Sequence, residues 1–257
     1  MFTSPSQILF TIFGVNIYYY GVIMALAIAC GTLVSDFIGT KYYNFPKDTF
    51  IDIAPYVIIS GIIGARLYYC LMDYDFYLRF PTEIVAIRHG GMSIHGAVLG
   101  GWFGLWIFSK RRRIQLLRLC DISAIGLSIG QAIGRWGNFF NSEAYGAPTN
   151  LPWKLYIAPQ YRQVPFADVS YYHPAFLYES ILDIIIFFIL VFFVNTKVSS
   201  KSGNLALIYL ILYSIARILV ETCRIDSVRY IFGIPVAIIV SAGIIIISGI
   251  LLFKVNK

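Results

Sequence analysis

Three arginines interrupt apolar stretches of this sequence, and an arginine in such surroundings needs an anionic partner. Arg66, Arg135 and Arg217 each lie within a run long and apolar enough to cross a bilayer. A guanidinium at the centre of a membrane costs about 2.5–3.5 kcal/mol unless an anion meets it. Phosphate oxygens suit the planar guanidinium well, because two charge-assisted hydrogen bonds can form at once. These residues therefore predict a phosphate-bearing ligand, and within a membrane that phosphate belongs to a lipid headgroup.

Counting residues along the apolar runs places further polar side chains at the depth of these arginines. Each arginine precedes the outer end of its run by about five or six residues, which corresponds to ~8–9 Å. Ionisable groups within a membrane are rare and tend to mark function. Further residues with polar side chains fall in this layer or just above it: Tyr20, His95, Glu143, Tyr178, Glu179 and Glu221.

Ion pairs within the protein are the alternative explanation for the buried arginines. Arg217 and Glu221 are four residues apart, a spacing that forms salt bridges along one helix. Glu179 could likewise neutralise Arg66 or Arg135, because buried charges are usually paired. Other acids are expected to lie outside this cluster: Asp36, Asp52 and Asp121 near the inner boundary, where water can solvate them, and Asp183 near the midplane, where a neighbouring helix is the expected partner.

Two glycine-rich motifs have both a chemical and a packing interpretation. Residues 126–130 read "GLSIG", which matches the GxSxG nucleophile elbow of hydrolases. That elbow needs a strand and a sharp turn before its helix, whereas these residues lie in the middle of an apolar run. We therefore interpret Ser128 as part of a helix-packing face. Residues 89–104 read "HGGMSIHGAVLGGWFG", where the glycines could admit a lipid acyl chain beside His95 or form a second packing face.

The composition indicates the class of protein that must position these residues. Of the 257 residues, 58% are hydrophobic and 13% are charged, about half the charged fraction of an average soluble domain. The net charge of +7 does not indicate nucleic-acid binding, because the cations lie in short loops between apolar runs. The four cysteines lie far apart without a CxxC spacing, so we expect no metal site and no disulfide, and no motif indicates a cofactor. The expected class is a polytopic membrane protein.

The apolar runs predict an all-α membrane protein with about seven transmembrane helices. A bilayer core needs about 20 apolar residues per helix. Residues 141–173, between the fourth and fifth runs, contain four prolines and many aromatic residues, and they predict a small, irregular cap on the outer side. We treat residues 1–257 as a single integral membrane domain with spans at about 18–39, 50–72, 90–109, 119–140, 174–194, 203–222 and 231–253.

The distribution of lysine and arginine predicts the orientation of these spans. With the N-terminus outside and the C-terminus inside, eleven basic residues face the inner side and six face the outer side, in agreement with the positive-inside rule. The run "KRRR" at 110–113 contributes most to this bias and would lie beside anionic lipid. The basic residues expected outside are Arg79, Arg88, Lys154, Arg162, Arg224 and Arg229.

Four segments, "GGMSIHGAVLGG", "GRWGNFFNSEAYG", "HPAFLYES" and "YSIARILVETCR", together resemble the prolipoprotein diacylglyceryl transferases, a family of bacterial inner-membrane enzymes. The segments occur in the family's order and at compatible spacing. The resemblance implies transfer of the diacylglyceryl group of phosphatidylglycerol to the lipobox cysteine of a prolipoprotein, with a thioether formed and glycerol-1-phosphate released. The sequence departs from the family at "RYIFGIPV", where the last span begins, and in the compact segment 141–173.

The resemblance also implies roles for individual residues. Arg135 and Arg217 would hold the phosphate and stabilise charge on the departing oxygen. His95 would take the proton of the thiol, unless the guanidiniums alone raise the thiolate fraction. The reaction needs no metal ion and no nucleotide. The residues that would bind or position the substrates are Tyr20, Arg66, Asn138, Glu143, Tyr178, Glu179, Tyr213, Glu221 and Arg224.

Two other function classes are compatible with parts of the pattern. A phospholipid transporter or scramblase would also need arginine at headgroup depth, but it would be expected to show cations in both leaflets or paired half-sequences. An intramembrane serine protease would need Ser128 and a histidine on a later span, whereas His173 lies outside the runs. The expected partners are therefore phosphatidylglycerol, prolipoproteins and membrane lipid, with no nucleic acid, in the bacterial cytoplasmic membrane.

Overall fold

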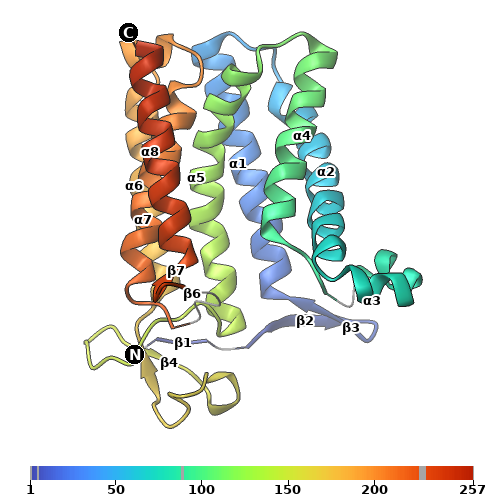
Figure 1. Ribbon diagram of the computed structural model, residues 1–257, viewed down its shortest axis with the longest axis vertical. Helices are drawn as coiled ribbons and strands as arrows, with labels where there is room; N and C mark the ends of the chain where they lie inside the picture. Colours follow the sequence, from blue (N-terminus) through green and yellow to red (C-terminus); the bar gives the residue numbers. More distant parts are fainter. Residues whose placement is uncertain (1, 5, 88–89, 226–229, 257) are drawn as a thin grey trace. The chain divides into compact units, whose positions relative to one another are not determined.

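The protein is mostly helical, as the apolar runs predict (Figure 1). The computed structural model describes residues 2–4, 6–87, 90–225 and 230–256, and helices make up 69% of the structure. Two of the basic residues expected outside, Arg88 and Arg229, lie outside the described residues. Within the described residues, six helices are long and apolar enough to cross a membrane: α1 (Tyr19–Tyr43), α2 (Thr49–Met72), α5 (Leu116–Asn141), α6 (Ala175–Phe193), α7 (Asn204–Glu221) and α8 (Val236–Asn256).

The expected span at 90–109 forms helix α4 (Ile94–Arg112), which is not among these six. Its glycines and the three basic residues of its last turn lower its mean hydropathy. A seventh span therefore stays a prediction. The limits of the other six expected spans agree with those of the helices to within five residues.

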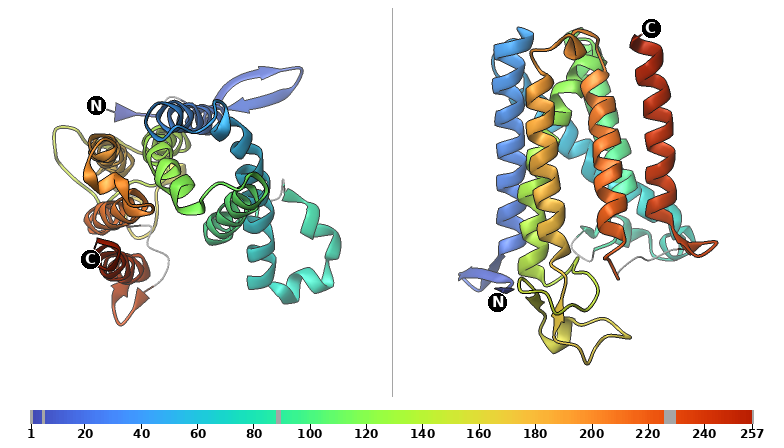
Figure 2. Two further views of the ribbon diagram at one scale, coloured as in Figure 1. Left: turned by 90° about the horizontal axis from the view of Figure 1, so that it is seen from above. Right: turned by 90° about the vertical axis from the view of Figure 1, so that its left-hand side faces the viewer.

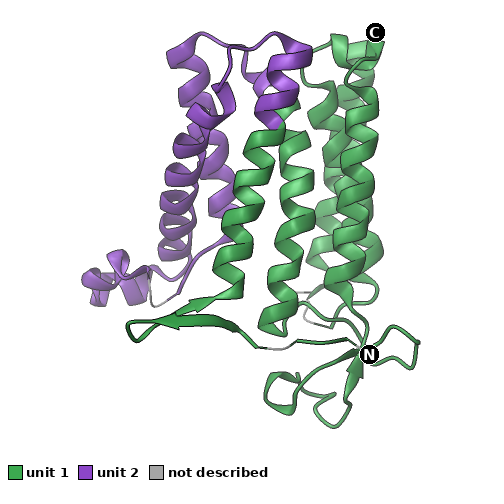
Figure 3. Cartoon of the chain, turned by 180° about the vertical axis from the view of Figure 1, so that it is seen from behind, with its two compact units in different colours: residues 1–34, 121–257 green, residues 35–120 purple. Residues whose placement is uncertain are grey.

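The chain divides into two compact units, whose boundaries fall within α1 and α5 (Figure 3). Unit 1 comprises residues 1–34 and 121–257, and unit 2 comprises residues 35–120. The expectation of a single integral membrane domain stays a prediction.

In unit 2, the glycines of α4 pack directly against the backbone of α2. A Cβ atom at Gly96 would collide with the carbonyl oxygen of Gly64, and a Cβ at Gly100 would collide with that of Ser60. At Gly104 a Cβ would lie 2.5 Å from the carbonyl oxygen of Tyr56. These glycines therefore form the packing face, and the backbone at these positions is not open to an acyl chain.

In unit 1, helices α6, α7 and α8 lie side by side (Figure 2). A short 3-10 helix, η4 (Lys197–Ser200), lies between α6 and α7. Helix α5 packs against α1 through Gly126, whose carbonyl oxygen lies 2.6 Å from where a Cβ of Gly31 would be. Gly126 opens the "GLSIG" motif, and Ser128 within it is fully buried and donates a hydrogen bond to the carbonyl of Ile125 at 2.7 Å. The packing interpretation of this motif is the one the structure supports.

Two acids expected to be solvated near the inner boundary are buried instead. Asp121 is fully buried, and its carboxylate accepts hydrogen bonds from the backbone N–H groups of Gly203 (2.7 Å) and Ala206 (2.9 Å) at the start of α7. Asp36 is buried and binds two N–H groups at the start of α2, at 3.0 and 3.1 Å. These N–H groups have no partner within their own helix, so both acids act as caps. Of the three acids, only Asp52 is exposed.

The segment between α5 and α6 has an apolar core of its own. It contains strands β4 (Leu155–Tyr156) and β5 (Tyr171–Tyr172) and the 3-10 helix η3 (Pro159–Tyr161), and β4 pairs in parallel with β1 (Phe2–Thr3). The buried side chains are Tyr145, Leu155, Ile157, Tyr172 and Phe176. The segment is therefore packed and carries two strands, and its position outside the membrane stays a prediction.

Two hairpins precede α1 and α8 without any intervening residue. Strands β2 (Ile8–Ile12) and β3 (Val15–Tyr18) form the first, and β6 (Tyr230–Ile231) and β7 (Ile234–Pro235) form the second. The sequence pattern did not predict either of them.

Candidate functional site

Glu179, near the start of α6, contacts three arginines of unit 1. Its Oε1 accepts hydrogen bonds from Nη1 of Arg224 at 2.7 Å and from Nη1 of Arg217 at 3.3 Å. Its Oε2 lies 2.6 Å from Nη2 of Arg135. Arg135 belongs to α5, Arg217 belongs to α7, and Arg224 follows the end of α7. The Glu179 carboxylate thus brings together guanidiniums from α5, from α7 and from the residues that follow α7.

The ion pairs of the arginine cluster among the described residues join three guanidiniums to two carboxylates. Arg217 also forms the expected pair with Glu221 four residues later, at 2.7 Å. Three guanidiniums therefore meet two carboxylates. The side chains of Arg135 and Arg217 are 23% and 22% exposed, whereas those of Glu179 and Glu221 are 6% and 1% exposed. The two carboxylates are buried under the guanidiniums, so the solvent-accessible surface of these residues is cationic.

Arg135 is the least engaged of these cations. Among the described residues it contacts a single carboxylate oxygen, Oε2 of Glu179 at 2.6 Å, whereas Arg217 contacts both Glu179 and Glu221. A guanidinium has five N–H donors. Arg135 therefore keeps further N–H donors that can bind the oxygens of another anion.

Contacts between neighbouring elements fix the geometry of the arginine cluster. Ser180, next to Glu179 in α6, donates a hydrogen bond to the carbonyl of Ala132 in α5 at 2.8 Å. Gly146 forms a β-bridge with Arg224, and a Cβ at Gly146 would lie 2.6 Å from the carbonyl oxygen of Cys223. The segment after α5 is thereby joined to the segment after α7, which holds Arg224 beside the carboxylate.

Two tyrosines predicted to bind substrate lie in hydrogen-bonded or stacked pairs. The hydroxyl of Tyr178 accepts a hydrogen bond from Nε1 of Trp153 at 2.8 Å and lies 3.1 Å from Nδ1 of His173. Tyr213 stacks on Tyr209, with ring centroids 5.8 Å apart. Tyr178 therefore ties the start of α6 to the segment between α5 and α6.

Asp183 was expected to pair with a neighbouring helix, and the structure shows this only in part. It is buried, and its Oδ2 has no hydrogen-bond partner in the described part of the chain. It lies one turn after Glu179 on α6. The structure therefore shows no hydrogen-bond partner for this atom among the described residues, whereas the charge of Arg135 in helix α5 acts on the carboxylate.

Tyr20 and Glu143 line a pocket of about 470 Å³ in unit 1. Glu143 accepts hydrogen bonds from Nδ2 of Asn138 at 2.9 Å and from Nδ2 of Asn141 at 3.2 Å. A volume in this range suits a small ligand or a headgroup. Asn141 was not among the predicted site residues, although it lies three residues after Asn138 and so on the same helix face. The lining residues are Gln7, Tyr18, Tyr20, Gly21, Asn141 and Glu143.

In unit 2, the guanidinium of Arg66 donates its hydrogen bonds to backbone carbonyl groups. Its side chain is buried, and it donates hydrogen bonds to the carbonyls of Ile84 at 3.0 Å, Gly90 at 2.6 Å and Gly91 at 2.9 Å, and to that of Glu83. Arg66 was predicted to bind substrate. Four of its five N–H donors are instead taken up by the chain that leads into α4.

Tyr77 of helix α3 (Tyr74–Arg79) covers the Arg66 guanidinium, with the ring centroid 5.2 Å from Cζ. Burial raises the pKa of the Tyr77 phenol, and the charge of Arg66 opposes that rise. Arg66 is therefore enclosed by aromatic side chain on one side and by carbonyl groups on the other.

His95 is the second residue of α4 and is exposed. Its ring lies 6.0 Å from that of Tyr68, centroid to centroid. No hydrogen bond joins His95 to any of the residues described, so both ring nitrogens are available to a ligand.

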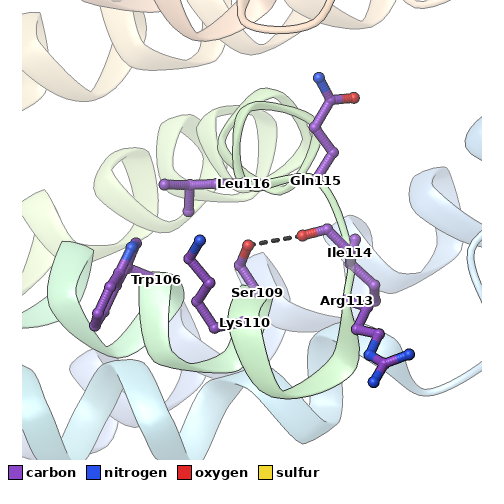
Figure 4. Close-up of a pocket in the computed structure, with 7 residues that line it drawn as sticks. All are labelled: Trp106, Ser109, Lys110, Arg113, Ile114, Gln115 and Leu116. Atoms are coloured by element: carbon purple, nitrogen blue, oxygen red, sulfur yellow. Dashed lines mark hydrogen bonds between the residues drawn. The ribbon is translucent and has the colours of Figure 1, made fainter.

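A second cavity, of about 510 Å³, lies where the basic end of α4 turns into α5 (Figure 4). Trp106 and Lys110 line it from α4, and Ser109 closes the turn with a hydrogen bond to the carbonyl of Ile114 at 2.7 Å. It contains none of the predicted site residues. We therefore place the candidate site at the arginine cluster.

A mostly helical membrane protein with an accessible cationic cluster near the ends of three helices is the class that this fold and site define. The chain belongs to the prolipoprotein diacylglyceryl transferase family, whose model matches residues 7–254. Similar proteins are named phosphatidylglycerol–prolipoprotein diacylglyceryl transferase. The relative from Trichormus variabilis is 43% identical over 88% of this chain and 82% of its own length. The relatives from Gloeobacter violaceus and Finegoldia magna are each 38% identical, over 100% and 98% of this chain and 95% and 96% of their own lengths.

Proposed function

We propose that this protein transfers the sn-1,2-diacylglyceryl group of phosphatidylglycerol to the lipobox cysteine of prolipoproteins. The reaction forms a thioether, releases glycerol-1-phosphate and is the first step of lipoprotein maturation. Membership of the family supports this reaction. The observation that carries it in the structure is Arg135, a partly exposed guanidinium that contacts a single carboxylate oxygen among the described residues and shares Glu179 with Arg217.

The arginine cluster suits the step in which charge moves onto phosphate. The cysteine thiolate attacks the glycerol carbon that bears the phosphate, and the carbon–oxygen bond breaks with its electron pair passing to the phosphate ester. Arg135 and Arg217 bind the phosphate oxygens and stabilise the charge that develops there. Glu179 holds both guanidiniums in place before the substrate binds, so less reorganisation is needed during the reaction.

His95 has a catalytic role in this proposal, and the remaining site residues bind the headgroup or position the cluster. His95, with both ring nitrogens available, accepts the proton of the thiol. Tyr20, Asn138 and Glu143 bind the polar headgroup in or beside the 470 Å³ pocket. Glu221 and Arg224 orient the cluster, and Tyr178 and Tyr213 support it through the contacts described above.

Arg66 has a different role from the one the resemblance implies. We propose that it holds the chain between η1 (Pro81–Val85) and α4, and that this fixes the start of the helix that carries His95. It would act on catalysis through that helix and would not touch the phosphate.

The site belongs in the outer leaflet of the bacterial cytoplasmic membrane in this proposal. We infer seven spans in a single membrane domain, with α4 as the seventh, the N-terminus and the segment 141–173 outside, and the C-terminus inside. The excess of basic residues on the inner side supports this orientation. Phosphatidylglycerol and the signal peptides of prolipoproteins would both reach the site from the membrane, and no nucleic-acid partner is proposed.

A dual-label assay tests the proposed reaction against lipid transport. Proteoliposomes contain phosphatidylglycerol labelled in its acyl chains and, separately, in its headgroup glycerol, together with a lipobox peptide. We expect acyl label in a thioether on the peptide and glycerol label in free glycerol-1-phosphate. Movement of intact phosphatidylglycerol between leaflets without modification of the peptide would instead identify a transporter.

A further inference from the structure

The two hairpins that precede α1 and α8 share a sequence and a turn. The first turn reads "IFGV" at 12–15 and the second reads "IFGI" at 231–234. Both central residues of each turn have positive φ, 48° and 78° at Phe13 and Gly14 and 51° and 77° at Phe232 and Gly233. This is the type I′ geometry, in which asparagine, aspartate or glycine is the usual residue at the first central position.

Phenylalanine is a costly choice at both tips in water. A non-glycine residue strains the backbone at positive φ, and a phenylalanine brings no local hydrogen bond in return. The side chains of Phe13 and Phe232 are 102% and 100% exposed, the largest values among the exposed apolar residues of the described chain. The same strained and exposed aromatic tip occurs twice, at the start of two different apolar helices.

The first hairpin has one apolar face and one polar face. Paired residues of a hairpin point to the same side, and the side alternates along each strand. The pairs Ile12–Val15 and Phe10–Ile17 thus share one face. Thr11 and Asn16 pair on the other, where the threonine hydroxyl donates to the asparagine Oδ1 at 2.8 Å.

The position of the hairpins places them at the surface of a membrane. Strand β3 ends at Tyr18 and α1 begins at Tyr19, and β7 ends at Pro235 and α8 begins at Val236. Both helices are long and apolar enough to cross a membrane. Both hairpins lie at the end of unit 1 opposite the C-terminus (Figure 1), and they project sideways from the helices (Figure 2). A hairpin that projects sideways from the end of a span lies along the interface.

The absence of charged residues within both hairpins also agrees with a place in the membrane interface. The sequence has no charged side chain between residues 2 and 35 and none between residues 230 and 253. Both hairpins can therefore enter the interfacial region without burying a charge.

We propose that the two Phe-Gly hairpins are interfacial anchors whose tips insert into one leaflet of the bilayer. The phenylalanine rings lie among the lipid acyl chains near the headgroups, and the polar Thr11–Asn16 face of the first hairpin stays toward water. The two anchors hold the beginnings of α1 and α8 at a fixed depth in that leaflet. This inference does not depend on the reaction that the protein catalyses.

Tryptophan at each tip tests the insertion. Phe13→Trp and Phe232→Trp variants are reconstituted separately in vesicles of phosphatidylcholine brominated at shallow or deep acyl positions, and the signal of the parent chain with its four tryptophans is subtracted. The control is Asp168→Trp, at an exposed position of the segment between α5 and α6. Each of these positions is exposed, so the substitutions leave packing intact.

We expect shallow bromines to quench each tip tryptophan at least about twofold more than the Asp168→Trp control, with weaker quenching by aqueous acrylamide than in that control. Quenching by acrylamide equal to that of the control would overturn the proposal, because the tips would lie in water. Protection from both quenchers would also overturn it, because a protein surface, such as a second copy of the chain, would then cover the tips.

Discussion

Glu179 shows how an ion pair and a ligand site can be built from the same residues. Its two oxygens contact three guanidiniums, while its own side chain is almost fully buried. Buried charges need partners, and without this carboxylate the three cations would repel one another. The pairing with Glu179 therefore lowers the repulsion among the three guanidiniums without neutralising all of their charge. A phosphate diester, with its single negative charge, would complete this charge balance from the exposed side.

Ser128 provides a test of the packing interpretation at the residue scale. Its hydroxyl bonds the backbone of its own helix and is fully buried, so Ser128→Ala removes one hydrogen bond and no reactive group. We expect the variant to keep most of its transferase turnover and to lose about 1 kcal/mol of stability or less. The measurement is thioether formation on a lipobox peptide. Loss of turnover with an unchanged unfolding temperature would revive the hydrolase interpretation.

At the scale of elements, Arg66 and the glycines before α4 together fix the chain that leads into this helix. Gly91 has a φ of 74°, and a Cβ there would lie 2.5 Å from Nη1 of Arg66. The neighbouring Gly90 has a φ of 87° but nothing within 4 Å of a Cβ. Both glycines provide the same unusual backbone, and only Gly91 makes room for the guanidinium. This pair separates backbone strain from the loss of the Arg66 contacts.

Gly91→Ala should therefore be more damaging than Gly90→Ala. Each substitution strains the backbone by about 1–2 kcal/mol, and Gly91→Ala also displaces charged hydrogen bonds worth about 1.5–3 kcal/mol each. We expect a lower unfolding temperature and lower kcat for Gly91→Ala, with KM for phosphatidylglycerol little changed, and the same pattern for Arg66→Lys. A rise in KM alone for Arg66→Lys would indicate that Arg66 binds the lipid.

The helices could be predicted from the sequence, whereas most of the side-chain contacts between them could not. Apolar runs identify spans because a bilayer leaves few other solutions for the backbone. The caps supplied by Asp36 and Asp121 were missed, because each acid serves a helix other than its own and no local pattern reports that contact. Arg66 was assigned to substrate for a similar reason. Its residue type indicates a need for oxygen ligands, and backbone carbonyls meet that need as phosphate would.

The convergence of charges in unit 1 could be predicted because it depends only on depth. Arg135, Glu179 and Arg217 are near the same ends of three neighbouring helices, so residue counting is sufficient to bring them together. The lateral contacts are different. The pairing of Gly146 with Arg224 requires the fold of the segment between α5 and α6, which period and hydropathy do not determine.

At the scale of the whole molecule, the orientation in the membrane is the first prediction to test. With seven spans and the N-terminus outside, a reporter fused after Lys257 should behave as a cytoplasmic protein, and one inserted at Gln160, an exposed position of the segment 141–173, should behave as a periplasmic one. The two reporters give opposite signals only if the number of spans between them is odd. Equal signals, or the reverse pair, would remove the outer-leaflet placement of the arginine cluster.

The central claim is that Arg135 and Arg217 clamp a phosphate while charge moves onto the leaving oxygen. Lysine keeps the charge but loses the planar fork that can engage two phosphate oxygens. If the arginines only neutralised Glu179 and Glu221, an ammonium would substitute tolerably. Arg162 is the matched control, because it lies in the same unit and donates hydrogen bonds to the carbonyls of Ile157 and Ala167 and to Ser170, away from the cluster.

The measurement is the turnover of thioether formation on a lipobox peptide at saturating phosphatidylglycerol, with the unfolding temperature of each variant recorded in parallel. For Arg135→Lys and Arg217→Lys we predict turnover lower by about tenfold to a thousandfold, or about 1.4–4 kcal/mol in activation free energy, with an unfolding temperature close to that of the parent. Arg162→Lys should show the opposite pattern, with lower stability and normal turnover. Near-normal turnover in both cluster variants would contradict the phosphate clamp.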